Sequence, residues 1–406
     1  MSVLLIGTLD TKGTEYAYVR DRLRAARVPV LVADAGVMGP PAFEPDISRA
    51  AIFSAAGANA ERVKATGDRG HAVELAALGA AKLAADLFKQ GKLTGVMGLG
   101  GSAGTTIATA AMRALPVGVP KLMVSTLASG QVQHFVGTRD VTMMYSVVDI
   151  AGLNRISRAV LDNAAGAMTG MVSLSGGRKP PVPGSDKPVI AATMFGVTTP
   201  CVEAARRVLE TAGYEVLVFH ATGTGGRTME GLIRDGLIAG VLDVTTTELA
   251  DELAGGILSA GPDRLTAAAL KGVPQVISLG ALAMVNFGPR DTVPERYKDR
   301  RFYQHNAAVT LMRTTPEEMD RLGKEIAEKT SAASGPTCVM VPLRGVSAID
   351  AEGKPFWWPE ADAALFQSVR NWIAPYVELV ERDENINDPA FAEACAKKLL
   401  QIMARS

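Results

Sequence analysis

The sequence predicts an α/β protein made of two Rossmann-like domains, each a mostly parallel sheet with helices on both faces. Short continuous apolar runs alternate with amphipathic helical stretches, a pattern typical of parallel strands buried on both faces. A segment rich in glycine and proline interrupts this alternation near the middle of the chain, and the alternation then starts again. These observations together favour two domains of similar architecture.

The first half of the chain reads as strands and helices in turn. Residues 3–6 form an apolar run, residues 7–13 a loop, and residues 15–26 a helix with apolar side chains at helical spacing. Because the connections in a parallel sheet are right-handed, the loops that follow the strands gather on one edge. The remaining elements continue the pattern: a strand at 28–32, a helix at 72–90, a strand at 94–98, a helix at 105–115 and a strand at 120–125.

The glycine- and proline-rich segment sets the predicted domain boundaries. We expect an N-terminal domain at residues 1–177, a linker at 178–188 and a C-terminal α/β domain at 189–406. In the second domain, the predicted strands lie at 189–195, 215–219, 240–244 and 274–278. A helical tail is expected after Pro359, with three aromatic anchors: Phe366, Trp372 and Tyr376.

Composition excludes several classes of protein. The 406 residues include 42 lysines and arginines and 42 aspartates and glutamates, so no net field attracts nucleic acid or an anionic membrane. Three cysteines, far apart, suggest neither a disulfide framework nor a zinc motif. The N-terminus lacks the pattern of a signal peptide, and no apolar stretch approaches the ~20 residues of a membrane span. We therefore expect a cytoplasmic protein that has neither nucleic acid nor membrane as a partner.

The strongest functional signal is the glycine-rich segment at residues 98–106. It follows an apolar strand and precedes a helix, so backbone N–H groups and the positive end of the helix would form an anion site. Ser102, Thr105 and Thr106 add hydroxyl donors. The segment contains no lysine, which excludes the P-loop pattern. The alternative is a tight turn where helix and sheet pack closely.

The loop at residues 7–13 is expected at the same edge of the sheet. Asp10 could orient a ribose hydroxyl or hold Mg²⁺, and Thr8 and Thr11 could contact phosphate. The alternative role of these threonines is to cap the helix that follows.

Two later strand ends add candidates for the same crevice. Asp34 and Gly36 stand where dinucleotide-binding folds contact ribose, although an ordinary turn is an equal explanation. Residues 125–130, which include Thr126 and Gly130, form a further hydroxyl-rich strand end. Asp149 is expected to cap the helix that carries Arg155.

The second domain contains its own candidate cleft. His220, at a strand end beside glycines, could bind phosphate or act as an acid or base, or could be a structural histidine. Glu248 stands in the first turn of a predicted helix, which gives it a structural explanation as well. His305 is the third catalytic candidate. The other residues of this second cleft are Thr222, Gly225, Gly226, Thr245, Thr246, Thr247 and Asn286.

These loops together resemble the Tm-one-like ATP-binding family, named for the N-terminal domain of the tomato mosaic virus resistance protein. The resemblance extends over essentially the whole chain. The matching segments are residues 7–13, 98–106, 111–113, 121–130, 152–157, 219–226, 245–251, 284–288 and 310–315.

The resemblance implies a homodimer of two-domain α/β chains with ATP bound in the N-terminal domain, and a separate TIM-barrel partner protein. The family pattern has an aspartate where this chain has Ala283, which puts activity in the second cleft in question. With the resemblance, the expected nucleotide contacts are Gly7, Thr8, Asp10, Thr11, Asp34, Gly36, Gly100, Gly101, Ser102, Gly104, Thr105, Thr126 and Gly130.

Two functions compete at this point. In the first, the protein is a nucleotide-dependent enzyme that acts on a small anionic metabolite at a cleft between the domains, with ATP and Mg²⁺ as cofactors. In the second, it is a non-catalytic module in which ATP stabilises one conformation and changes a partner's affinity. A weaker third option is an isomerase or hydrolase of small acids. The sequence leaves the choice open.

Overall fold

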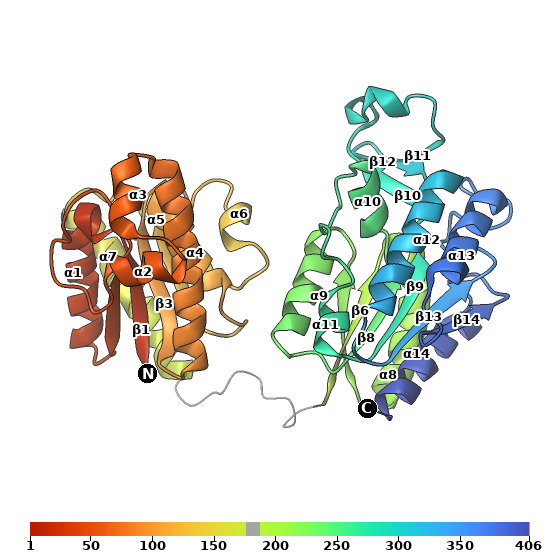
Figure 1. The fold of residues 1–406 in the computed structure, drawn as a ribbon, viewed down its shortest axis with the longest axis horizontal. Coiled ribbons are helices and arrows are strands. Elements are labelled where there is room, and N and C mark those ends of the chain that lie inside the picture. The colour runs from red at the N-terminus through yellow and green to blue at the C-terminus, as the bar shows by residue number, and fades with distance from the viewer. Residues whose placement is uncertain (176–186, 406) are drawn as a thin grey trace. The chain divides into compact units, whose positions relative to one another are not determined.

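The computed structural model describes residues 1–175 and 187–405, and the chain divides into two compact units, Met1–Pro181 and Val182–Ser406 (Figure 1). Of the expected linker, residues 178–186 lie outside the described residues. Each unit contains a parallel sheet flanked by helices, which confirms the predicted fold class.

The N-terminal unit has a five-stranded sheet in the order β2-β1-β3-β4-β5, and all of its strand pairs are parallel. Its elements in chain order are β1 (Ser2–Gly7), α1 (Leu9–Ala25), β2 (Val30–Asp34), α2 (Arg49–Ala55), α3 (Ala60–Thr66), α4 (Arg69–Lys89), β3 (Leu93–Gly100), α5 (Ser102–Arg113), β4 (Lys121–Ser125), α6 (Gln133–Val136), β5 (Thr142–Tyr145) and α7 (Arg155–Ser175).

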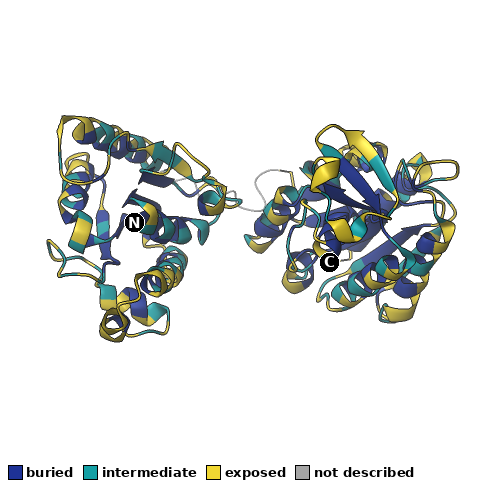
Figure 2. Cartoon of the chain, turned by 90° about the horizontal axis from the view of Figure 1, so that it is seen from above, coloured by how far each residue is buried: buried dark blue, intermediate teal, exposed yellow. Residues whose placement is uncertain are grey.

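Side-chain alternation along β1 explains why both faces of this sheet are covered. Leu4 and Ile6 face a core shared with α2, α4 and α5, whereas Val3 and Leu5 face a core shared with α1 and α7. Figure 2 shows the result, with the strands and the inner sides of the helices buried and the outer sides exposed.

The C-terminal unit repeats this plan with six parallel strands in the order β14-β13-β9-β8-β6-β7. A three-stranded antiparallel sheet, β10-β12-β11, was not predicted and extends from the same unit (Figure 1). The elements are β6 (Val189–Met194), η1 (Gly196–Thr198), α8 (Thr199–Thr211), β7 (Glu215–His220), α9 (Thr224–Arg234), β8 (Gly240–Thr245), α10 (Glu248–Ala254), α11 (Ala267–Lys271), β9 (Gln275–Gly280), β10 (Met284–Phe287), η2 (Arg290–Thr292), η3 (Glu295–Tyr297), β11 (Phe302–Asn306), β12 (Val309–Arg313), α12 (Pro316–Ser331), β13 (Thr337–Pro342), α13 (Pro359–Trp372), β14 (Glu378–Arg382) and α14 (Pro389–Met403).

The tail after Pro359 differs from the prediction. It contains two helices and also the edge strand β14, which pairs with β13 and completes the sheet of the C-terminal unit. Of the three expected anchors, only Phe366 is buried, whereas Trp372 and Tyr376 are 49% and 74% exposed. The five residues of β14 contain only two apolar side chains, Leu379 and Val380, which are adjacent, so no alternation marks the strand within a helical stretch.

Two local predictions in the N-terminal unit were also wrong. Helix α1 begins at Leu9, so residues 9–13 lie in its first turns, where we expected a loop. The reason is tertiary, because the Asp34 carboxylate accepts a hydrogen bond from Leu9 N–H. The N-terminus of α7 is capped by Asn154, whose side chain accepts from the N–H groups of Ile156 and Ser157, and Asp149 does not cap it.

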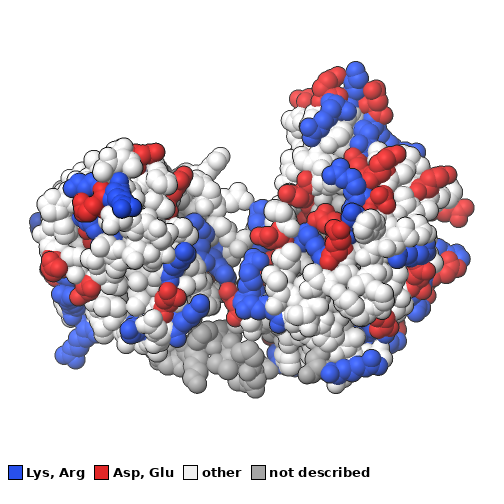
Figure 3. Space-filling view, viewed as in Figure 1, with Lys and Arg blue, Asp and Glu red and all other residues white. Residues whose placement is uncertain are grey.

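Surface composition agrees with the charge balance of the sequence. On the face drawn in Figure 3, basic and acidic side chains are interspersed over each unit. Among the helices of residues 1–175 and 187–405, none is long and apolar enough to cross a membrane.

One buried hydroxyl joins the two central strands of the N-terminal unit. Tyr16 Oη lies 2.7 Å from the carbonyl oxygen of Ile6 and 2.8 Å from that of Leu99, and it accepts a hydrogen bond from Leu99 N–H. Burial raises the pKa of Tyr16 well above its ordinary value, so the hydroxyl keeps its proton. A Cβ on Gly7 would lie 1.8 Å from this hydroxyl, which is why glycine is required there.

We expect Tyr16→Phe to destabilise the N-terminal unit by about 1–3 kcal/mol, because buried backbone groups lose their partner. All three tryptophans, Trp357, Trp358 and Trp372, lie in the C-terminal unit. In urea, the hydrogen exchange of β1 and β3 should therefore accelerate while the tryptophan fluorescence transition stays in place. Tyr18→Phe, which removes a part-buried hydroxyl bond to Asp162, is the matched control and should have a smaller effect.

Candidate functional site

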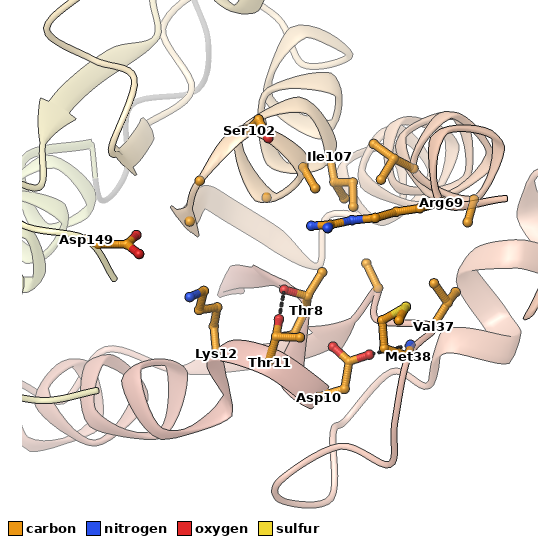
Figure 4. A pocket seen from close by; sticks show the side chains of 17 residues that line it. Thr8, Asp10, Thr11, Lys12, Val37, Met38, Arg69, Ser102, Ile107 and Asp149 are labelled. Carbon is orange, nitrogen blue, oxygen red and sulfur yellow. Dashed lines mark hydrogen bonds between the residues drawn. The ribbon is translucent and has the colours of Figure 1, made fainter. Parts of the chain in front are cut away.

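The strand order of the N-terminal unit creates a crevice between β1 and β3. The chain leaves β1 toward β2 on one side and leaves β3 toward β4 on the other, so the strand order reverses between them. In open α/β sheets, ligands bind beyond the carboxyl ends of strands at such a reversal. A pocket of about 220 Å³ opens at this place, and Figure 4 shows the side chains that line it.

The N-terminus of α5 opens directly on the pocket. Gly101 is its N-cap and makes no side-chain cap bond, so the first N–H groups of the helix, from Ser102 to Gly104, have no helical partner. In contrast, side chains of Ser48, Asn59 and Asp68 cap α2, α3 and α4. An uncapped, positively polarised helix end that faces a pocket is suited to an anion.

Close packing accounts for three of the four glycines of residues 98–106, and Gly101 is the exception. A Cβ on Gly98 would lie 2.3 Å from the Ala108 Cβ. Gly100 has φ +156° and lies against Gly104, where an added Cβ would be 3.1 Å from the Gly104 Cα. A Cβ on Gly104 would lie 3.1 Å from the carbonyl oxygen of Leu99. At Gly101 the nearest atom, Thr126 Oγ1, would be 3.6 Å away, which is ordinary contact. The space beside Gly101 belongs to the pocket.

Two cations line the pocket, and sequence reasoning assigned a role to neither. Arg69 is the exposed first residue of α4, and Lys12 lies where α1 departs from helical geometry. In the described part of the chain, neither side chain forms an ion pair with a carboxylate. Figure 4 shows both extending toward the pocket from different elements. They supply the positive charge that the glycine segment lacks.

Part of the pocket lining is apolar. It consists of Val37, Met38, Ala72, Val73 and Ile107. A pocket that combines cations and open backbone N–H groups with apolar side chains fits a ligand that carries both phosphate and a flat apolar group.

Asp10 holds the backbone of the segment that carries Met38, one of the apolar lining residues. One of its carboxylate oxygens accepts hydrogen bonds from the N–H groups of Met38 (2.7 Å) and Gly39 (3.2 Å). Its other oxygen is buried without a hydrogen-bond partner, and a Cβ on Gly36 would lie 2.3 Å from it. One Asp10 oxygen is thus engaged with backbone, and the described residues contain no group of three or more carboxylate, histidine or cysteine side chains that could hold a metal ion, so Mg²⁺ at Asp10 stays a prediction.

Asp34 is also a structural residue here. It is 1% exposed, one oxygen accepts from the N–H groups of Leu9 (3.1 Å) and Gly36 (3.0 Å), and the other accepts from Arg49 Nε at 2.9 Å. Both oxygens are therefore occupied. Asp34 also does not line the pocket.

The pocket therefore brings together about half of the expected nucleotide contacts. Those that line it are Thr8, Asp10, Thr11, Gly100, Gly101, Ser102 and Gly104. Those that do not line it are Gly7, Asp34, Gly36, Thr105, Thr126 and Gly130. Sequence reasoning missed Lys12, Arg69 and Asp149. Lys12 stood inside a segment already singled out, whereas Arg69 had no local signal, because it reaches the pocket through the packing of α4.

In the C-terminal unit, the second glycine loop already holds an anion. Glu248 Oε1 accepts hydrogen bonds from the N–H groups of Gly223 (2.7 Å) and Gly226 (3.0 Å), and Oε2 accepts from Arg264 Nε at 2.6 Å. Arg264 also pairs with Asp243, and all of these charged groups are buried. The protein's own carboxylate thus occupies the N-terminus of α9.

The threonines after β8 are part of the interior. Thr245 Oγ1 lies 2.8 Å from Thr198 Oγ1, and Thr246 Oγ1 donates to the carbonyl oxygen of Ser278. Thr247 Oγ1 and Asn286 Oδ1 are buried without a hydrogen-bond partner in the described residues. The hydroxyls of Thr245 and Thr246 thus bond to neighbouring elements, and all four residues of this group are buried.

The structure does not join the three catalytic candidates. His220 is exposed at the end of β7, with its ring 5.5 Å from that of Phe195, and His305 is exposed on β11. Among the described residues, no hydrogen bond or ion pair links either histidine to Glu248.

Fold and pocket together define a doubly wound α/β protein with a candidate anion-binding site in its N-terminal unit. Residues 1–176 match the N-terminal domain, and residues 187–403 the C-terminal domain, of an uncharacterised protein family, UPF0261. The chain belongs to this family.

Its relatives include bacterial and plant proteins. A UPF0261 protein of Clostridium tetani is 51% identical over 99% of each chain. The ToMV resistance protein Tm-1(GCR237) of Solanum lycopersicum is 46% identical over 77% of this chain and 42% of its own length. The expected relationship to Tm-1 is thus confirmed, and ATP binding stays a prediction. A solved UDP-N-acetylglucosamine 2-epimerase from Rickettsia bellii covers 100% of this chain and 96% of its own at 9% identity, but its TM-score of 0.23 carries no argument.

Unit-specific pH dependence follows from Asp251 in α10. Burial raises its pKa to about 7, although Asn286 and Leu258 N–H donate hydrogen bonds to it. A raised folded-state pKa means that the folded unit binds a proton that the unfolded chain releases above about pH 4. The stability of the C-terminal unit should therefore fall as pH rises from about 4 to 7.

We expect Asp251→Asn to reduce this dependence by at most about 1.4 kcal/mol per pH unit, and the part due to Asp362, whose pKa burial also raises to about 7, should remain. Urea transitions followed by tryptophan fluorescence at several pH values measure it. Asp263→Asn, at an unburied aspartate of the same unit, is the control. Equal slopes for wild type and Asp251→Asn would contradict the assignment.

Proposed function

We propose that the N-terminal unit binds ATP in the pocket between β1 and β3, with the phosphates on the N-terminus of α5. The observation that carries this proposal is the uncapped end of α5, which opens on a pocket that also contains Arg69 and Lys12. Backbone N–H groups and two cations from other helices provide what the lysine of a P-loop provides elsewhere.

The polar and the apolar lining residues suggest how the nucleotide would be oriented. The N–H groups of residues 102–104 and the hydroxyls of Thr8 and Thr11, whose Oγ1 atoms lie 2.9 Å apart, would contact the phosphates. Val37 and Met38, which Asp10 holds in place, would contact the base together with Ile107. Asp10 thus acts on the ligand through this apolar lining.

We further propose a nucleotide-responsive binding module rather than an enzyme acting on a small anionic metabolite. The glycine loop of the second cleft, which could have held an anionic ligand, is occupied by Glu248 and its partner Arg264. A second copy of the chain and a separate TIM-barrel protein remain proposed partners, which only the family resemblance supports. The tomato relative is longer than this chain, which spans 42% of it.

Calorimetric titration with ATP tests the proposal. Arg69→Ala and Ser102→Ala should each weaken binding about ten- to hundredfold, because a charge-assisted hydrogen bond to phosphate contributes about 1.5–3 kcal/mol. Arg62→Ala, which removes an exposed arginine from the neighbouring α3, is the matched control and should bind like wild type. The absence of heat with wild-type protein at millimolar ATP would refute ATP binding.

Gly101→Val gives a sharper prediction. At residue 101 φ is negative (φ −83°, ψ −152°), and nothing lies closer than 3.6 Å to the new Cβ. We therefore expect a protein that still shows a cooperative urea transition and has no measurable ATP binding, because the side chain fills the pocket. Retained affinity in this variant would place the ligand elsewhere.

A further inference from the structure

Two side chains of helix α1 form hydrogen bonds with the loop that follows β5. Lys12 Nζ donates a hydrogen bond to the carbonyl oxygen of Ile150, and Glu15 Oε1 accepts one from Gly152 N–H at 2.5 Å. Lys12 and Glu15 stand three residues apart, on the same side of the helix. Two hydrogen bonds therefore join the loop, residues 146–152, to α1. The core packing of the Ile150 side chain and a hydrogen bond from Ser146 N–H to the Ser125 carbonyl oxygen also hold the loop.

The hydrogen bonds of Lys12 and Glu15 differ in their surroundings. Glu15 is 2% exposed and is shut into the interior, whereas Lys12 lines the pocket. Lys12 also interrupts α1, with φ −127° and ψ 17°. Its ammonium group carries three donors, of which the structure commits one to a neutral carbonyl. In Figure 4 this group lies between Thr11 and Asp149.

The same loop carries local backbone strain. Val147 has φ +65°, in the left-handed region that a β-branched residue rarely adopts, and its side chain is 56% exposed. Ser146 holds the turn, since its Oγ donates to the carbonyl oxygen of Val148 at 2.7 Å. Asp149, two residues further along, lines the pocket. A strained segment thus begins within two residues of the candidate ligand site.

We propose that Lys12 is a ligand-operated latch: phosphate draws its ammonium group from the Ile150 carbonyl, and the backbone of residues 146–151 is loosened while the Ile150 side chain stays in the core. This inference rests on the proposed function. Phosphate is ionised and the Ile150 carbonyl is neutral, so Coulomb attraction favours phosphate as the partner of the Lys12 ammonium group. The Glu15 bond to Gly152 persists and ends the loosened segment, and Val147 leaves its strained conformation.

Hydrogen exchange of the full chain, measured by mass spectrometry, tests the latch. In wild type, saturating ATP should accelerate the exchange of residues 146–151 about tenfold, the effect of losing one hydrogen bond of ordinary strength. Lys12→Met, which removes the donor, should show that faster exchange without any ligand, and ATP should add nothing. Lys64→Met, the same change at an exposed lysine of α3, should behave like wild type.

The outcomes separate the latch from nucleotide binding itself. Calorimetry on the same samples reports whether ATP binds. If ATP binds to wild type and the exchange of the loop is unchanged, the latch is wrong and the proposed function stands. If ligand-free Lys12→Met exchanges like wild type, the Lys12 bond does not restrain the loop and the latch is again wrong. If ATP does not bind, both proposals fail together.

Discussion

The candidate site depends on the placement of β1 beside β3, and the Tyr16 hydroxyl fixes that contact. The hydroxyl touches the backbone of Ile6 and of Leu99, just before both strands end. The Tyr16 hydroxyl occupies the space that a side chain at residue 7 would take. Glycine at residue 7 is therefore required by this contact and not by a ligand. Any ligand in the crevice is held by loops whose spacing these hydrogen bonds set.

The two units place a glycine-rich helix start in opposite situations. In the C-terminal unit, Glu248 satisfies the N–H groups of Gly223 and Gly226, and Arg264 neutralises the carboxylate, so an external anion has no vacancy to fill. In the N-terminal unit, α5 has no such partner, and two cations stand at the pocket. Similar local sequence therefore supports an internal ion pair in one unit and a candidate ligand site in the other.

Local pattern predicted the parallel strands, the helices between them and the anion-suited end of α5, because periodicity and glycine content act over a few residues. The roles of individual acidic residues were harder to predict. Asp10 and Asp34 stand at strand ends as ligand-binding carboxylates do, yet both hold backbone N–H groups of neighbouring segments. Arg69 reaches the pocket only because α4 packs beside α5, a contact between residues far apart in sequence.

By itself, the sequence determined the fold class, the two-part plan and a glycine segment suited to phosphate, since these follow from alternating apolar runs and from backbone freedom at glycine. Only the tertiary structure decided which helix starts are open and which are filled. That choice depends on where a distant carboxylate or cation comes to rest, as Glu248 does at α9 and Lys12 and Arg69 do near α5. Side-chain charge acts through space, and the chain must fold before the partners meet.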